Sequence, residues 1–153
     1  MDTCLQKQFA PHNACFGCGP ANSQGLGLQS FVKGEIVVAT WQPLPFHEAF
    51  PGVLNGGIIG TLLDCHSNWT AAYHLMKMTE ESKPPCTVTA FFNVTLKRPT
   101  NSRQVVDLQA TVKEISANRA LIEAKLFSND ELCATCEGLF VAVKAGHPAY
   151  HRW

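Results

Sequence analysis

Residues 50–64 read FPGVLNGGIIGTLLD, and this stretch decides the fold. Pro51 keeps its start out of a helix. From Gly56 to about Met78 the chain has no Pro, no Gly after position 60, and apolar side chains at helical spacing. This pattern predicts a mostly buried helix of roughly five to six turns, with Asn55 as its N-cap.

Strand patterns lie on both sides of this helix. The expected strands cover residues 26–33, 35–42, 86–98, 104–115, 119–128 and 131–144. One long helix across one face of an antiparallel sheet is an α+β arrangement, here a long central helix wrapped by a five- to six-stranded sheet. Such a sheet leaves an edge exposed unless a second copy pairs with it, so we expect a homo-oligomer.

The remaining segments set the expected domain limits. Residues 1–24 are rich in Cys, Gly, Pro and Asn without periodicity, which predicts an irregular N-terminal segment. The length of 153 residues suits one domain, expected over residues 25–145, with a C-terminal tail at 146–153.

Charge and composition exclude several classes of partner. Twelve Lys and Arg balance twelve Asp and Glu, so no net field attracts nucleic acid or an anionic membrane. The chain lacks the charged-then-apolar start of a signal peptide and any apolar run of the ~18 residues that span a bilayer. We therefore predict a cytoplasmic protein with neither nucleic-acid nor membrane partners.

Seven cysteines, an odd number, predict free thiols in such a protein. Cys15-x-x-Cys18 and Cys133-x-x-Cys136 suggest a four-thiolate zinc site as an alternative. Cys133 and Cys136 lie in an expected strand, however, where side chains three residues apart face opposite sides and cannot bind one ion. We therefore predict neither a metal nor a cofactor.

Four segments together resemble the hotdog-fold thioesterase superfamily, in its phenylacetate-pathway-type branch. They are residues 50–64, Cys15 to Pro20 with the GLGL of residues 25–28, residues 87–94, and Arg98-Pro99. The family signature is His-Gly-Gly at a helix start, with an Asp nine residues after the His; here Asn55 stands in place of the His. The resemblance implies a hotdog fold and an acyl-CoA thioesterase that works as a dimer or a dimer of dimers.

The family signature suggests which groups carry the chemistry. The backbone N–H groups of Gly56 and Gly57 are free at a helix start, and the resemblance implies that Gly56 polarises the thioester carbonyl. Asp64 is a lone carboxylate in an apolar helix, and we expect it to act as general base or nucleophile; a hydrogen-bonded structural Asp is the alternative. Eight residues separate Gly56 from Asp64, about 12 Å of helix. One thioester therefore needs Asp64 from a second copy.

Two more residues complete the expected catalytic set. Thr89 resembles the Ser or Thr that relatives use to orient the attacking water, although an ordinary strand threonine is an equal alternative. Asn55 can cap the helix and donate a hydrogen bond to a substrate carbonyl, but it cannot titrate near neutral pH.

The substrate-binding candidates are all polar. His47 and Glu48 precede the signature and can line an acyl pocket or assist the leaving thiolate, or simply belong to a surface loop. Lys97, Arg98 and Arg119 are candidates for the phosphates of CoA, with a solvated strand edge as the alternative.

Two rival functions remain open at this point. One is a noncatalytic hotdog protein that binds acyl-CoA. The other is a hotdog dehydratase with a catalytic His near the central helix, an option that Asn55 weakens and His47 keeps open.

Overall fold

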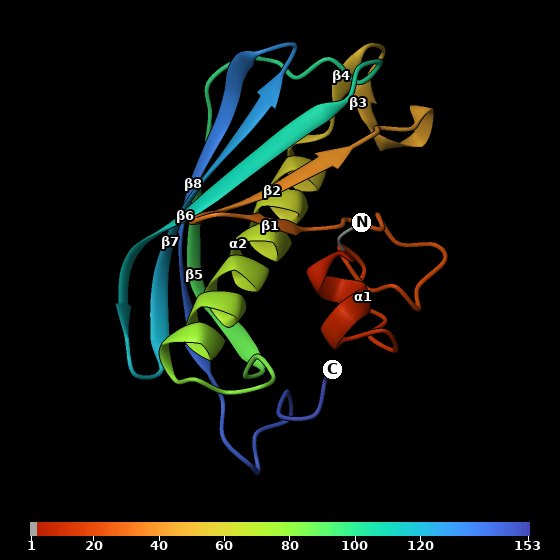
Figure 1. The fold of residues 1–153 in the computed structure, drawn as a ribbon. Coiled ribbons are helices and arrows are strands. Elements are labelled where there is room, and N and C mark those ends of the chain that lie inside the picture. Colours follow the sequence, from red (N-terminus) through yellow and green to blue (C-terminus); the bar gives the residue numbers. More distant parts are fainter. Residues whose placement is uncertain (1–2) are drawn as a thin grey trace.

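The computed structural model describes residues 3–153 and contains one six-stranded antiparallel sheet that curves around a long helix, α2 (Gly56–Met78) (Figure 1). In spatial order the strands are β1 (Phe31–Lys33), β2 (Ile36–Trp41), β6 (Val106–Ser116), β7 (Arg119–Ser128), β8 (Glu131–Ala142) and β5 (Thr87–Leu96). The predicted α+β fold, a long central helix against a sheet, is confirmed.

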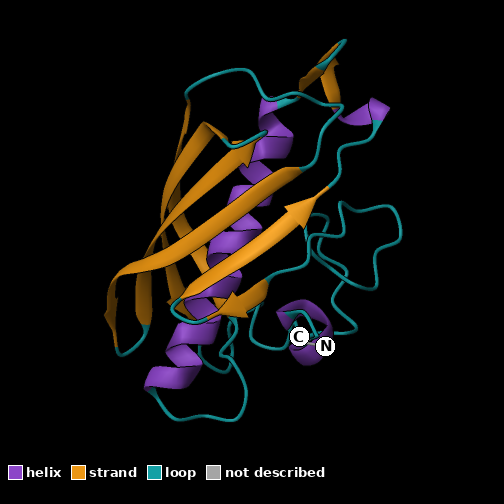
Figure 2. Ribbon diagram, turned by 45° about the horizontal axis from the view of Figure 1, so that its top comes forward, coloured by secondary structure: helices purple, strands orange, loops and turns teal. Residues whose placement is uncertain are grey.

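Helix α2 forms where the sequence predicts it. The Asn55 side chain accepts a hydrogen bond from the Ile58 N–H at 3.1 Å, which confirms Asn55 as the N-cap. One face of α2 contacts strands β5, β6, β7 and β8. Figure 2 shows the helix crossing the sheet obliquely along its length. Leu62, Leu63 and Trp69 are among the fully buried side chains of α2, so the helix supplies much of the core.

Two expectations for the N-terminal region are wrong. Helix α1 (Leu5–Phe9) lies within the segment that was expected to be irregular. The first strand covers only residues 31–33 instead of 26–33, because the N–H groups of Leu26 and Leu28 bond to the carbonyls of Phe16 and Gly17 rather than to a strand. The N-terminal segment and the chain end both lie on the side of α2 away from the sheet (Figures 1 and 2).

A buried polar network ties this N-terminal segment to α2. His66 is fully buried, and burial lowers its pKa to about 4, so the ring is neutral at pH 7. Its Nε2 donates to the Val37 carbonyl and its Nδ1 accepts from the Ser30 hydroxyl. Ser30 in turn is bonded twice to the Gln6 amide. The network therefore fixes α1 and β2 on one turn of α2.

Strand β5 forms one edge of the sheet and carries a bulge between Thr89 and Phe91. Thr87 bonds to Asn68 of α2, so residues of odd number face the helix before the bulge. After it Phe92 lies against Gly60, so even-numbered residues face the helix. The bulge thus reverses which side chains of β5 point at α2.

No helix within residues 3–153 combines the length and the apolar composition that a membrane span requires.

Candidate active site

Two backbone amides remain unpaired at the start of α2 within the described residues. The Asn55 N–H donates to the His47 carbonyl, the Ile58 N–H to the Asn55 side chain, and the Ile59 N–H to the Asn55 carbonyl. No hydrogen bond inside the described part of the chain uses the N–H of Gly56 or of Gly57. These N–H groups, at the positive end of the helix dipole, can donate hydrogen bonds to a negatively charged oxygen.

Asp64 and Thr89 form a second polar group, two helical turns from the first. The Thr89 hydroxyl donates to the Asp64 carboxylate at 2.8 Å, so the two predicted residues contact each other within one chain. Burial raises the pKa of Asp64 above its ordinary value, while the hydrogen bond from Thr89 and the charge of Arg152 act the other way. Arg152, on the C-terminal tail, was missed because nothing in its sequence context links a chain end to α2.

The helix start opens into a cleft of about 420 Å³. Its walls come from the loop before α2, the first turns of α2 and the end of β5, and include Phe50, Leu54, Gly56, Ile59, Leu96, Lys97 and Arg98. The predicted residues Gly56, Lys97 and Arg98 are therefore brought together. Apolar walls with a free amide and two cations at the rim suit an anionic ligand that has an apolar part.

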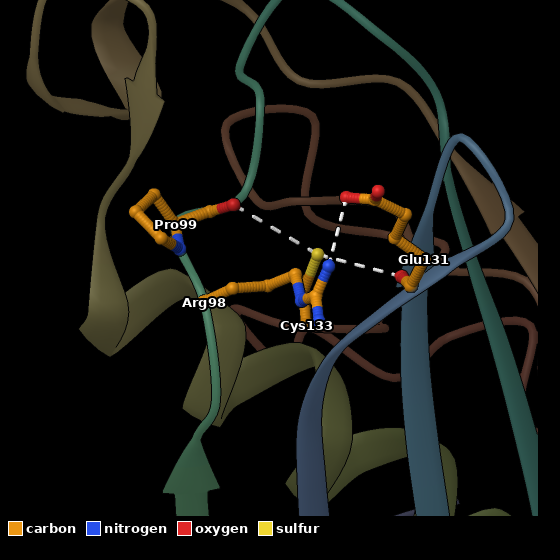
Figure 3. A network of polar contacts seen from close by, with 4 residues as sticks. All are labelled: Arg98, Pro99, Glu131 and Cys133. Carbon is orange, nitrogen blue, oxygen red and sulfur yellow. Dashed lines mark hydrogen bonds and ion pairs between the residues drawn. The ribbon is translucent and has the colours of Figure 1, made fainter.

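Contacts with β8 hold the two cations in place, and Figure 3 shows those of Arg98 and Pro99 with Glu131 and Cys133. The backbone N–H groups of Lys97 and Arg98 both donate to the Cys133 carbonyl, and the Cys133 thiol contacts the Pro99 carbonyl. The Arg98 guanidinium pairs with Glu131 at 3.1 Å. Both side chains are more than half exposed, so the pair contributes little stability and Arg98 can exchange Glu131 for a phosphate.

His47 and Glu48 hold the loop that forms one wall of this cleft. His47 Nδ1 accepts from the Leu44 N–H, its ring lies 4.9 Å from that of Trp41, and burial lowers its pKa. The Glu48 carboxylate accepts hydrogen bonds from the Ser102 hydroxyl and the Gly52 N–H. These bonds use His47 Nδ1 and one carboxylate oxygen of Glu48, so both side chains help to hold the loop.

Arg119 lies far from Lys97 and Arg98 in one chain. Arg119 pairs with Val141 of β8, whereas Leu96 pairs with Ala134 of the same strand. Seven residues of strand correspond to roughly 23 Å. One chain alone therefore does not gather the three predicted cations.

The hydrogen bonds to Glu48 predict a pH-dependent stabilisation of the loop. The bond from Ser102, then that from Gly52, lowers the Glu48 pKa below its ordinary value of 4.5. The charged carboxylate therefore stabilises the fold above pH 4.5, and this contribution is lost as the pH falls through the lowered value. We expect Glu48→Gln to lower the urea midpoint at pH 7 and to approach the wild type once the pH falls below the lowered pKa of Glu48. Exposed Glu35→Gln is the control; equal midpoints for Glu48→Gln and wild type at pH 7 would contradict the interpretation.

The N-cap predicts a second stability difference. Asn55→Ala removes the acceptor for the Ile58 N–H and should cost about 1 kcal/mol of unfolding free energy. Asn55→Asp keeps an acceptor oxygen and should stay within a few tenths of the wild type. Urea titration of the three proteins measures the difference, and similar losses in both variants would show that the cap contributes nothing.

Similarity to solved structures extends over most of the chain. A thioesterase superfamily protein from Shewanella loihica is 31% identical, and the match covers 82% of this chain and 98% of that protein with a TM-score of 0.67. A thioesterase from Haemophilus influenzae (20% identity, 80% and 84% coverage, TM-score 0.67) shares the fold. So does the Escherichia coli PaaI protein from the phenylacetic acid degradation operon (13%, 78% and 81%, 0.64).

Neither a family model nor a curated protein matches the chain. The Shewanella protein nevertheless shares nearly a third of its residues over almost its whole length, and its fold agrees with the one described above. The segments of the chain that resemble the family signature lie at the start of α2, on α2 itself and on β5. The chain belongs to the hotdog-fold thioesterase superfamily.

Proposed function

We propose that this protein hydrolyses acyl-CoA thioesters in two equivalent active sites, each shared between two copies of the chain. The observation that carries the proposal is the division of the catalytic groups along α2. The unpaired amides lie at Gly56 and Gly57, and the Asp64–Thr89 pair lies two turns further on. About 12 Å of helix separates them, too far for one thioester group to contact both.

The free edge of β5 offers the surface for a second copy. Phe91, Phe92 and Leu96 on this strand are 41%, 41% and 56% exposed, although they are large and apolar. An exposed apolar edge strand invites another strand to pair with it. Antiparallel pairing of two β5 edges about a two-fold axis would place the two α2 helices side by side in opposite directions. Asp64 of one copy would then face the helix start of the other.

Hydrolysis follows from the groups at such a shared site. The thioester carbonyl oxygen accepts a hydrogen bond from the Gly56 N–H, and the helix dipole stabilises the oxyanion that forms there. Asp64 of the other copy takes a proton from a water molecule that Thr89 orients, and the hydroxide attacks the carbonyl carbon. The C–S bond then breaks, and the proton passes to the CoA thiolate. Attack by Asp64 itself is the alternative, and it needs the same carboxylate.

Asn55 takes over part of the role of the signature histidine in this proposal. Its side-chain oxygen is used by the helix cap, which leaves its amide N–H₂ free to donate toward the carbonyl. Unlike histidine it carries no titratable proton, so hydrolysis here relies on the good leaving-group properties of the CoA thiolate.

The cations at the cleft are the reason for proposing CoA as the carrier of the acyl group. Lys97 and Arg98 lie beside the helix start, where the phosphates of CoA would meet them. The two-fold axis would also turn the end of the sheet that carries Arg119 in one copy toward the end that carries Lys97 in the other.

Loss of the carboxylate tests the chemical step. We expect Asp64→Asn to reduce kcat by at least about a hundredfold, because no general base or nucleophile remains. Thr89→Val should reduce kcat by a smaller factor.

The matched control is the exposed Thr40–Asp107 pair, which has the same 2.8 Å hydrogen bond on the sheet. Thiol release is measured with short, medium, long and aromatic acyl-CoA esters. Asp107→Asn and Thr40→Val should release thiol at the wild-type rate from each ester. Wild-type turnover by Asp64→Asn would overturn the mechanism, and CoA-ester binding without thiol release by the wild type would favour the noncatalytic alternative.

Mixing two inactive variants tests whether the sites are shared. Gly56→Pro removes the amide donor, and proline is well accepted at the first position of a helix after an extended residue such as Asn55. Each homodimer, Gly56→Pro or Asp64→Asn, should be inactive. A heterodimer of the two contains one doubly altered site and one intact site, so it should recover up to half of the wild-type activity. An inactive heterodimer, or a monomer by light scattering, would contradict shared sites.

A further inference from the structure

Three cysteine side chains from two distant segments meet on the far side of α2 from the sheet. Cys15 and Cys18 come from the N-terminal loop, and Cys65 follows the catalytic candidate Asp64 on α2. Their sulphur atoms all lie within 4.8 Å of one another, and the Cys15 and Cys65 sulphurs are 3.8 Å apart. Cys18 and Cys65 are buried, whereas Cys15 is half-buried.

The loop is shaped to bring these sulphurs together. A Cβ at Gly17 would collide with the Cys65 sulphur and would lie 2.8 Å from Thr61, so only glycine lets the loop approach α2 this closely. The Gly19 N–H bonds to the Cys15 carbonyl at 2.8 Å and closes the turn that holds Cys15 and Cys18 side by side. A Cβ at Gly19 would strike the backbone of Cys15 and its neighbours.

A buried hydrogen-bond donor lies beside the cluster. The indole N–H of Trp69 is buried without an oxygen or nitrogen partner among the described residues and lies beside the Cys18 sulphur. A buried donor without an oxygen or nitrogen partner is uncommon, and an acceptor bound at this position would account for it. Thiolates held by a metal ion are such acceptors.

We propose that the Cys15, Cys18 and Cys65 thiolates bind one Zn²⁺ ion, which fixes the N-terminal segment on α2. Tetrahedral zinc with Zn–S bonds of about 2.3 Å sets its sulphurs about 3.8 Å apart, a separation that Cys15 and Cys65 already have. Binding releases one proton from each thiol that is protonated beforehand. A water molecule completes the tetrahedron on the exposed side of Cys15.

Cys-x-x-Cys spacing alone suggests Cys133 and Cys136 as the remaining ligands of this site, and that suggestion is wrong. Cys133 and Cys136 do not join it, since Cys133 faces the Pro99 carbonyl at the cleft. The third thiol comes from α2 instead, one residue after Asp64. The ion would therefore be a structural element next to the active site, without contact to the thioester.

Metal analysis of the full chain, purified under reducing conditions, tests the site directly. We expect about one zinc per chain, and Co²⁺ in its place should give the charge-transfer and visible bands of tetrahedral thiolate ligation. Cys15→Ser and Cys65→Ser should lose the ion. Cys86→Ser is the matched control, since Cys86 is buried but lies outside the cluster, and it should retain the ion. Chelation should lower the Tm of the wild type by about 10 °C and leave Cys65→Ser unchanged.

Three results would overturn the site. The first is wild-type protein that takes up neither Zn²⁺ nor Co²⁺ when each metal is titrated alone. The second is zinc content that Cys15→Ser and Cys65→Ser leave intact, which would mean an adventitious ion only. The third is a Cys15–Cys65 disulfide in the purified protein, detected as a loss of two hydrogens by mass spectrometry. None of these results depends on thioesterase activity.

Discussion

Burial of the 23-residue helix α2 is the constraint on which the rest of the structure depends. In a helix enclosed between a sheet and an N-terminal segment, a polar side chain without a partner is costly. Three polar side chains of α2 have such partners. His66 is bonded to Ser30 and β2, Asn68 to Thr87, and Asp64 to Thr89. Asp64 is less buried than the other two, and so of these three it is the one that a substrate or a water molecule can reach.

In the proposed mechanism one chain provides only parts of two sites, and the same helix explains why. Its start offers unpaired amides, and its middle offers a carboxylate whose basicity burial raises. A straight helix keeps these groups apart, and only an antiparallel second helix can combine them. The bulge in β5 fits this arrangement, because it lets Thr89 reach Asp64 while the later residues of the strand keep apolar side chains beside the helix start.

Most of the candidate site was visible in the chain as residue types at particular spacings. Gly56, Gly57 and Asp64 stand out because a helix start with two glycines and a lone acid in an apolar helix are unusual in a sequence. Thr89 was a candidate only through the resemblance to the family, with an ordinary strand threonine as an equal alternative. The partners of Glu48, the position of Arg152 and the separation of Arg119 from Lys97 were not predictable. They depend on how loops and chain ends return to the core, and no local pattern encodes that.

By itself the sequence determined the limits of α2, the N-cap and the order of the long strands, because helix and strand periodicity, capping and turn chemistry act between residues close in the chain. Only the tertiary structure decided that the N-terminal segment folds over α2, that β1 is short, and that Cys65 meets Cys15 and Cys18. The reason is physical: these features arise from contacts between residues tens of positions apart, whose geometry is set by the packing of the whole chain.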